Sequence, residues 1–199
     1  ARYPQHGILG EEDGVTNPDA QVQWILDPID GTRSFMRGIP LYGVLIGIRV
    51  RGVPEVGVAH FPALGATVAA ATGLGCTWNG RPARVSRVSE LAGAAVLTTD
   101  PLVLLDGDMR PGWERLVRIA GLARSWGDCY GHMLVATGRA EVMVDPVLSP
   151  WDAAPFIPIL REAGGLFTDR HGEARFDGGS GLSTNGLLHP EVLALLRSA

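Results

Sequence analysis

The feature that most constrains this fold is an apolar segment that runs directly into two carboxylates. Residues 22–27, VQWILD, have the apolar composition of a strand, and PIDG follows at once. Pro28 cannot continue a strand ladder, so a strand ending at Asp27 presents the Asp27 and Asp30 carboxylates at one sheet edge. Desolvating two neighbouring carboxylates is costly unless a partner compensates them. The segment therefore predicts a binding edge or an aspartate-capped turn.

The remaining apolar pattern predicts two halves of different architecture. Alternating apolar runs separated by turn signals such as Asn79-Gly80 indicate antiparallel strands at 43–50, 52–62, 66–73 and 75–86. Further along the chain, apolar residues at helical spacing alternate with short strands, and this spacing predicts helices at 112–123, 130–138 and 151–165. We expect 1–92 to form a mainly antiparallel half that carries the acidic motif, and 93–199 to form an α/β half.

Composition excludes several classes of function. A formal net charge of -4 provides no basic field for nucleic acid or an anionic membrane. No apolar run approaches the roughly 20 residues of a transmembrane helix, and the first residues do not resemble a signal peptide. The cysteines, Cys76 and Cys129, are too few for a disulfide framework, although one disulfide stays possible. We expect a cytoplasmic protein with a small-molecule partner.

The acidic motif is also compatible with phosphate chemistry. A helix beginning near Gly31 and Thr32 would offer free backbone N–H groups to an anion, next to the carboxylates of Asp27 and Asp30. Carboxylates and phosphate repel each other unless a cation lies between them, and Mg²⁺ prefers carboxylate and phosphate oxygens. The competing interpretation is an Asx-type turn with a capping aspartate, which on spacing alone is more common.

Two further acidic positions strengthen the metal interpretation. Glu11 and Glu12 lie between glycines, a pattern typical of a solvated loop. Asp152 lies at the start of a predicted helix, where a lone aspartate ordinarily serves as an N-cap. Each of these acidic sites adjoins apolar sequence at an element terminus. If they converge, four carboxylates tolerate one another only with a metal ion.

These residues resemble the inositol monophosphatase family. The resemblance rests on GEE at 10–12, WILDPIDGTRSFMRGIP at 24–40 and WDAAPFIPILREAGGLFTD at 151–169, and it continues to near the C-terminus. It implies a layered αβαβα sandwich and Mg²⁺-dependent hydrolysis of phosphate monoesters, without a covalent enzyme intermediate and with two or three ions per site.

The resemblance also implies roles for individual residues. Four carboxylates and one carbonyl would bind metal: Glu11, Asp27, Asp30, Asp152 and the Ile29 carbonyl. The Gly31 and Thr32 amides would hold the phosphate, and the Thr32 hydroxyl would orient the attacking water. Catalysis would then involve Glu11, Asp27 and Thr32.

Within the family, the chain is most similar to the histidinol-phosphate phosphatase branch. Arg33 follows the threonine of the motif, a W-G-D segment precedes the helix at 130–138, and Pro158 lies six residues after Asp152. In this branch Asp145 or Asp128 could bind the substrate amine. Arg33 could contact phosphate or a neighbouring chain, and an ordinary surface arginine is the alternative.

The resemblance leaves other functions open. Inositol 1-phosphate or another sugar or nucleotide phosphate would use the same metal site. Family members carry an N-terminal helical segment whose aspartate pairs with the threonine of the motif, and no residue here can take that role. We therefore expect a missing or incomplete N-terminal helical layer, and a non-catalytic metal- or phosphate-binding domain is the alternative of another class. Relatives commonly form homodimers.

Overall fold

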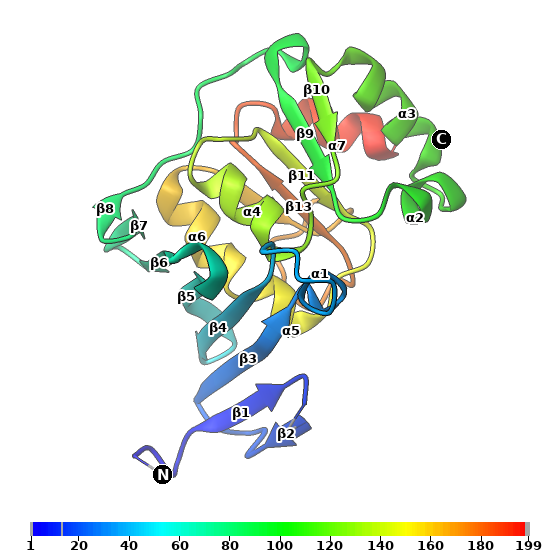
Figure 1. Cartoon of the computed structure of the whole chain (residues 1–199). Coiled ribbons are helices and arrows are strands. Elements are labelled where there is room, and N and C mark those ends of the chain that lie inside the picture. The colour runs from blue at the N-terminus through cyan, green and yellow to red at the C-terminus, as the bar shows by residue number, and fades with distance from the viewer. Residues whose placement is uncertain (1, 13, 198–199) are drawn as a thin grey trace.

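The computed structural model describes residues 2–12 and 14–197, in which two sheets are separated by helices (Figure 1). The first sheet has the strand order β2-β1-β3-β4-β5-β6-β7-β8. Its strands are β1 Gly7–Gly10, β2 Gly14–Thr16, β3 Val22–Asp30, β4 Gly43–Val50, β5 Val53–Phe61, β6 Ala66–Ala71, β7 Gly75–Trp78 and β8 Arg81–Pro82. Apart from the parallel pair β1–β3, neighbouring strands are antiparallel.

The second sheet has the order β10-β9-β11-β13-β12 and is mixed. Its strands are β9 Ala95–Thr98, β10 Leu122–Arg124, β11 Val142–Asp145, β12 Leu166–Thr168 and β13 Gly181–Thr184. Strands β10, β9 and β11 run parallel, so their carboxyl ends meet at one edge of the sheet. Loops at such an edge commonly form binding sites in α/β proteins.

The helices form one layer between the sheets and another beyond the second sheet. They are α1 Thr32–Phe35, α2 Pro101–Asp106, α3 Arg110–Ile119, α4 Asp128–Ala136, α5 Pro150–Ala153, α6 Phe156–Ala163 and α7 His189–Arg197, with single 3₁₀ turns at Pro62–Leu64 and Leu91–Gly93. Helices α4 and α6 lie between the two sheets, and α3 and α7 cover the far face of the second sheet (Figure 1).

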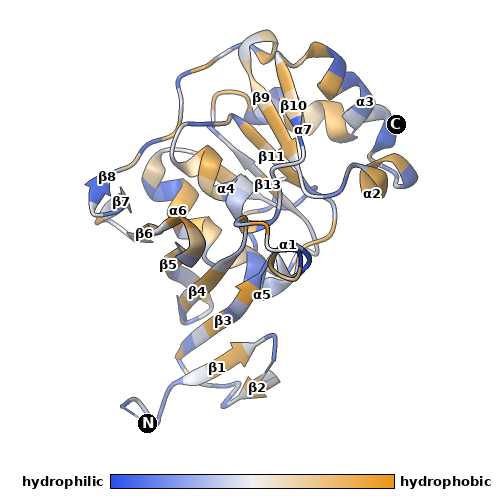
Figure 2. Ribbon diagram, viewed as in Figure 1, coloured by the Kyte–Doolittle hydropathy of each residue, from blue (hydrophilic) through white to orange (hydrophobic). Residues whose placement is uncertain are grey.

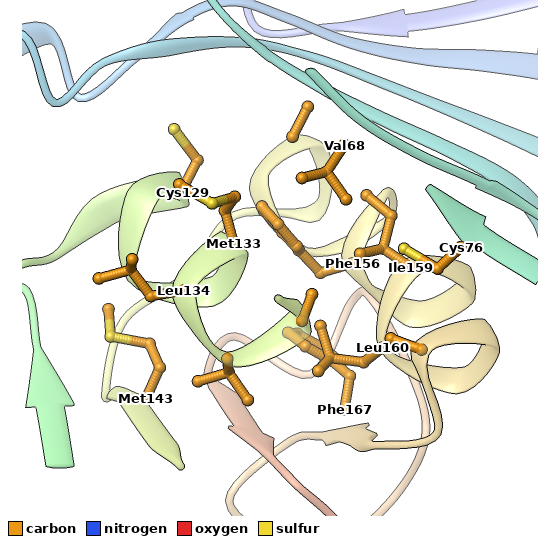
Figure 3. Packing of buried hydrophobic residues seen from close by; sticks show 14 of the residues in the cluster. Val68, Cys76, Cys129, Met133, Leu134, Met143, Phe156, Ile159, Leu160 and Phe167 are labelled. Carbon is orange, nitrogen blue, oxygen red and sulfur yellow. The ribbon is translucent and has the colours of Figure 1, made fainter. Parts of the chain in front are cut away.

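Two apolar clusters correspond to these layers. The first joins β4–β6 to α4, α6 and one face of the second sheet, with Leu45, Phe61 and Phe156 fully buried. Figure 3 shows Phe156 packed among Met133, Ile159 and Leu160 in this cluster. The second cluster lies between the other face of the second sheet and helices α2, α3 and α7. Coloured by hydropathy, β9 and β11 are mostly apolar along their length, as expected for strands covered on both faces (Figure 2).

The layers follow the order β, α, β, α, which corresponds to four of the five layers of an αβαβα sandwich. In the described residues, no helical layer covers the outer face of the first sheet. The hairpin of β1 and β2 extends from the body of the molecule (Figure 1). None of the described helices is long and apolar enough to cross a membrane.

Three sequence expectations about the elements were wrong in detail. Strand β3 continues past Asp27 to Asp30, because Pro28 falls where the pairing with β4 becomes irregular. The helix predicted at 112–123 ends at Ile119, and Leu122–Arg124 instead pairs with β9 as a parallel strand.

The helix predicted at 151–165 is two helices, α5 and α6, which meet at Ala154 and Pro155. This break explains Pro158. It is the third residue of α6, where a backbone N–H has no intrahelical acceptor and its absence costs little. Gly164, with φ 89°, ends α6 as expected.

Candidate metal and phosphate site

Three carboxylates converge where β3 meets α5. One oxygen from each of Asp27, Asp30 and Asp152 lies within 4.8 Å of the other two, although Asp152 is far from the two β3 residues in the sequence. Asp27 and Asp30 end β3, and Asp152 lies in the first turn of α5. The structure therefore brings together three of the four carboxylates that the sequence predicted as metal ligands.

An irregular register in the first sheet brings the two β3 carboxylates together. Residues three apart in a regular strand point to opposite faces. Here Asp27 pairs with Leu45 and Asp30 with Gly43. An advance of three residues along β3 therefore corresponds to an advance of only two residues along β4. The extra residue restores a common direction, as a β-bulge does.

Asp152 owes its position to a helix cap. A lone aspartate here would ordinarily be an N-cap, but Ser149 is the N-cap and Asp152 is the third helical residue. The Ser149 backbone N–H donates to Asp152 Oδ2 at 2.9 Å, in a reciprocal capping box. This bond fixes one carboxylate oxygen and leaves the other for a ligand.

Backbone donors orient the β3 carboxylates. The Ile29 N–H donates to Asp27 Oδ1 at 2.9 Å. The Cys129 N–H, from the start of α4, donates to Asp30 Oδ2 at 2.6 Å, and the Cys129 thiol opposes the rise in the pKa of the same carboxyl. The contact with Cys129 links the first sheet to the second half of the chain.

The electrostatics of the cluster favour a cation. Burial, followed by the proximity of Asp152, raises the pKa of Asp27 from 3.8 to about 7. Burial is also the largest cause for Asp30 and Asp152, whose pKa values likewise rise to about 7. Without a cation, the carboxylates therefore hold protons that they would release in water.

Glu11 lies beside this cluster, not within it. It follows β1, and its N–H donates to the Leu26 carbonyl at 3.2 Å. Partial burial and the nearby Asp27 carboxylate raise the pKa of Glu11. The side chain is exposed, so the loop that carries it is solvated, but it adjoins the acidic site.

The segment after Asp30 forms a tight backbone turn. Gly31 has φ 79°, and a Cβ there would lie 2.9 Å from the Leu41 carbonyl oxygen and 3.3 Å from Asp128 Oδ2. Only glycine fits this conformation and spacing comfortably. The short helix α1 begins at Thr32, whose hydroxyl donates to the Ile29 carbonyl at 3.0 Å. The helix start expected near residues 31 and 32 is confirmed.

A pocket of about 400 Å³ opens beside this turn. Its lining comes from α1 and from the loops at the carboxyl ends of β9 and β10: Gly31, Thr32, Arg33, Ser34, Thr99, Asp100 and Asp128. Arg33 Nη1 lies 3.9 Å from Asp100 Oδ2. Burial and then the nearby Asp145 raise the pKa of Asp128 to about 6, whereas His132 and Arg33 oppose the shift.

Asp145, the other predicted substrate residue, lies deeper than Asp128. It is 3% exposed, accepts from the Thr99 N–H at 3.3 Å through Oδ1 and contacts His132 Nε2 at 3.2 Å through Oδ2. His132 is itself 1% exposed, and no sequence pattern indicated this contact. Sequence reasoning missed Thr99, Cys129 and Ser183 as residues around the site, because none belongs to a recognisable motif.

Comparison with known proteins agrees with this arrangement. A profile of the inositol monophosphatase family matches residues 1–199. The chain belongs to the inositol monophosphatase family. The expected αβαβα-type fold is also confirmed, because the inositol monophosphatase from an Anabaena (Nostoc) species superposes with a TM-score of 0.89 at 33% identity, over 98% of this chain and 79% of that one.

Two relatives of this inositol monophosphatase family member are named histidinol-phosphatase. The protein from Chlorobaculum parvum is 46% identical over 197 residues, which cover 98% of this chain and 76% of that protein. The protein from Mycobacterium tuberculosis is 41% identical over 204 residues, which cover 98% and 77%. The chain is thus a phosphoric monoester hydrolase of a metal-dependent family, and its acidic cluster can hold a metal ion.

Proposed function

We propose that this chain is a Mg²⁺-dependent phosphatase that hydrolyses L-histidinol phosphate to L-histidinol and phosphate. The observation that carries the metal and phosphate chemistry is the convergence of Asp27, Asp30 and Asp152 beside the Gly31 turn. The two relatives named histidinol-phosphatase support the choice of ester. We also propose a cytoplasmic homodimer, as the family resemblance implies.

The donor set fits Mg²⁺. The cluster consists of oxygen donors only, and the raised pKa values of its carboxylates indicate a lack of compensating positive charge. In the proposed site the ions are held by Glu11, Asp27, the Ile29 carbonyl, Asp30 and Asp152. Bound Mg²⁺ would supply a water of lowered pKa and would offset charge on the phosphate oxygens.

The residues of the chain would position the reacting groups. The Gly31 and Thr32 amides would bind the phosphate, since they lie at the start of α1, where the first N–H groups have no intrahelical acceptor. The Thr32 hydroxyl is already directed towards the Ile29 carbonyl, which places it next to the metal donors. Glu11 and Asp27 share the acidic side of the site and would accept the proton of the attacking water.

The pocket beside the turn suits a phosphate ester that carries an amine. The Asp128 carboxylate lines it, and an ammonium group is a natural partner for a carboxylate. Arg33 is well exposed at the rim, where it would meet phosphate. A direct role for Asp145 in substrate binding stays a prediction, and its burial favours an indirect one.

Inositol 1-phosphate is the second candidate substrate. A Synechocystis protein named inositol-1-monophosphatase is 35% identical to this chain over 201 residues. That identity is lower than for the histidinol-phosphatases of Chlorobaculum parvum and Mycobacterium tuberculosis, which is why we rank it second, although a third protein of that name, from Streptomyces coelicolor, is 34% identical.

The test is phosphate release from L-histidinol phosphate and from myo-inositol 1-phosphate, each with and without Mg²⁺. We expect release to require Mg²⁺ and kcat/KM to be higher for histidinol phosphate. Asp27→Asn and Asp30→Asn should each lower kcat at least about a hundredfold, because each removes a charged metal ligand. Asp19→Asn, an exposed carboxylate elsewhere, is the matched control.

Three outcomes would contradict parts of this proposal. Full activity in Asp30→Asn would exclude the metal assignment. A preference for inositol 1-phosphate would exclude the substrate assignment. Mg²⁺ binding without release of phosphate from either ester would favour the non-catalytic binding domain.

A further inference from the structure

A buried polar chain connects the second sheet to the substrate pocket. It begins with His132, on α4, whose Nδ1 lies 2.7 Å from Ser183 Oγ on β13 and whose Nε2 lies 3.2 Å from Asp145 Oδ2 at the end of β11. These three side chains are at most 3% exposed. A carboxylate oxygen accepts, so Nε2 donates to Asp145 and Nδ1 accepts from the serine hydroxyl.

The chain continues from Asp145 to the pocket wall. The other oxygen of Asp145 accepts from the Thr99 N–H at 3.3 Å. The Thr99 hydroxyl in turn accepts from the Asp128 N–H at 2.8 Å. Four hydrogen bonds therefore link Ser183 in the core to the residue that carries the pocket carboxylate.

Asp128 needs this support because its backbone is strained. Its φ of 51° lies in the left-handed region, which non-glycine residues rarely occupy and which costs free energy. The neighbouring Gly127 packs so closely on Thr99 that a Cβ would overlap with Thr99 Cα and Oγ1. The contact with Thr99 thus fixes the segment at both residues.

The packing around His132 holds its ring in one position, so it anchors the series of hydrogen bonds. Its ring packs against the rings of Phe156 and Phe167, with centroids 4.9 and 5.8 Å away. In such apolar surroundings an unpaired polar group is costly, so the two hydrogen bonds of His132 strongly favour one arrangement of Asp145.

We propose that His132 is a positioning residue for substrate recognition: through Asp145 and Thr99 it determines where the Asp128 carboxylate stands in the pocket. His132 itself does not reach the pocket. The consequence for selectivity towards an aminated ester rests on the proposed function, whereas the mechanical coupling of His132 to Asp128 does not.

The test uses variants that interrupt the chain at two links. His132→Phe keeps the ring volume but removes both hydrogen bonds. Thr99→Val removes the hydroxyl that accepts from Asp128 and keeps the backbone N–H that donates to Asp145, and Thr99→Ser restores the hydroxyl. His189→Phe is the matched control. His189 is also a buried histidine that contacts two hydroxyls, those of Thr184 and Thr168, but neither belongs to the hydrogen-bonded series from Ser183 to Asp128.

The first measurement is amide hydrogen exchange in the peptide around Asp128, which needs no substrate. We expect His132→Phe and Thr99→Val to accelerate exchange there about tenfold or more, with α3 peptides unaffected, because the local opening free energy falls. Thr99→Ser and His189→Phe should exchange like the unmodified chain in that peptide. Unchanged exchange in both disruptive variants would overturn the coupling.

The second measurement is the ratio of kcat/KM for L-histidinol phosphate to kcat/KM for phenyl phosphate. Both disruptive variants should lower this ratio about tenfold, mainly through KM for the aminated ester. The double variant should lower the ratio by less than the product of the two separate fold-changes, because both substitutions interrupt the same series of hydrogen bonds. Equal losses on both esters would overturn the role in recognition. If the unmodified chain does not hydrolyse histidinol phosphate, the proposed function fails and the exchange result alone decides the coupling.

Discussion

Cys129 connects the metal site to the core through its backbone and its thiol. Its N–H donates to the Asp30 carboxylate, its thiol opposes the rise in the pKa of that carboxyl, and its sulfur fills the space left by the missing side chain of Gly43. Groups that orient a metal ligand from outside the coordination sphere typically tune metal affinity. The thiol is therefore expected to matter although it does not react.

Replacing this thiol should weaken metal binding. Cys129→Ala keeps the backbone donor and loses the thiol, and we expect the Kd for Mg²⁺ to rise about tenfold. Cys129→Ser retains a donor and should stay near the affinity of the unmodified chain. Titration calorimetry with Mg²⁺ measures both, and Cys76→Ala is the control for losing a buried thiol elsewhere. An unaltered Kd in Cys129→Ala would show that the N–H alone orients Asp30.

The contact between the first sheet and the α5–α6 turn is the element-scale feature that places Asp152. Gly57 on β5 approaches Pro155 so closely that a Cβ would overlap with the Pro155 carbonyl oxygen. On β4, a Cβ at Gly47 would lie 3.1 Å from the Ala154 side chain. Both strands therefore need glycine where the turn rests on them, and α5 is held against β3 as a result.

Adding one methyl group at this contact should destabilise the fold. Gly57→Ala must displace backbone, so we expect the free energy of unfolding to fall by about 2 kcal/mol or more. Gly93→Ala, where the new Cβ would meet only Val88 Cγ1 at 3.6 Å, should change it by less than about 0.5 kcal/mol. Urea unfolding followed by circular dichroism measures both. Equal stability of the two variants would contradict this packing argument.

Most long elements could be predicted from the sequence, and the exceptions have physical causes. Strands β4, β5 and β6 follow their apolar alternation, because one face of each strand is buried. Strand β10 has only three residues and is defined by its pairing with β9, which no local pattern encodes. The break at Pro155 had a local signal, since two prolines fall within four residues, but helical periodicity on both sides concealed it.

The candidate site divides in the same way. Asp27, Asp30 and Asp152 were predictable because each adjoins an apolar segment at the end of an element. His132 and Ser183 were not, because a buried histidine and a strand serine acquire their roles only when β11, β13 and α4 pack together. The functions assigned to the predicted site residues stay predictions, as does the division of the chain into two halves.

At the scale of the whole molecule, the acidic cluster links stability to pH. Asp27, Asp30 and Asp152 have pKa values of about 7 in the folded, metal-free chain and ordinary values of 3.8 when unfolded. The folded chain thus binds more protons near neutral pH than the unfolded chain. This contribution to stability is fully present below the ordinary value and is lost as the pH rises through about 7.

The melting temperature should therefore depend on pH and metal together. Without metal, we expect it to fall between about pH 5 and about pH 8, whereas Mg²⁺ should raise it more at the higher pH, because bound metal replaces the protons. Differential scanning calorimetry with and without chelator measures this. Asp30→Asn should flatten the metal-free pH dependence. A melting temperature that rises over this range without metal would contradict the argument, provided that the transition is reversible.

The metal-binding carboxylates and the pocket residues from the second half of the chain are held by different elements, and this affects how substrate specificity can evolve. The carboxylates are held by a strand irregularity in the first sheet and a capped helix, whereas Thr99 and Asp100 lie in the loop after β9 and Asp128 begins α4, after β10. Loops tolerate replacement far better than paired strands do. Substitutions in the loop after β9 can therefore change which ester the pocket accepts while the strand and the capped helix keep the metal-binding carboxylates in place, so that a new specificity can arise through active intermediates.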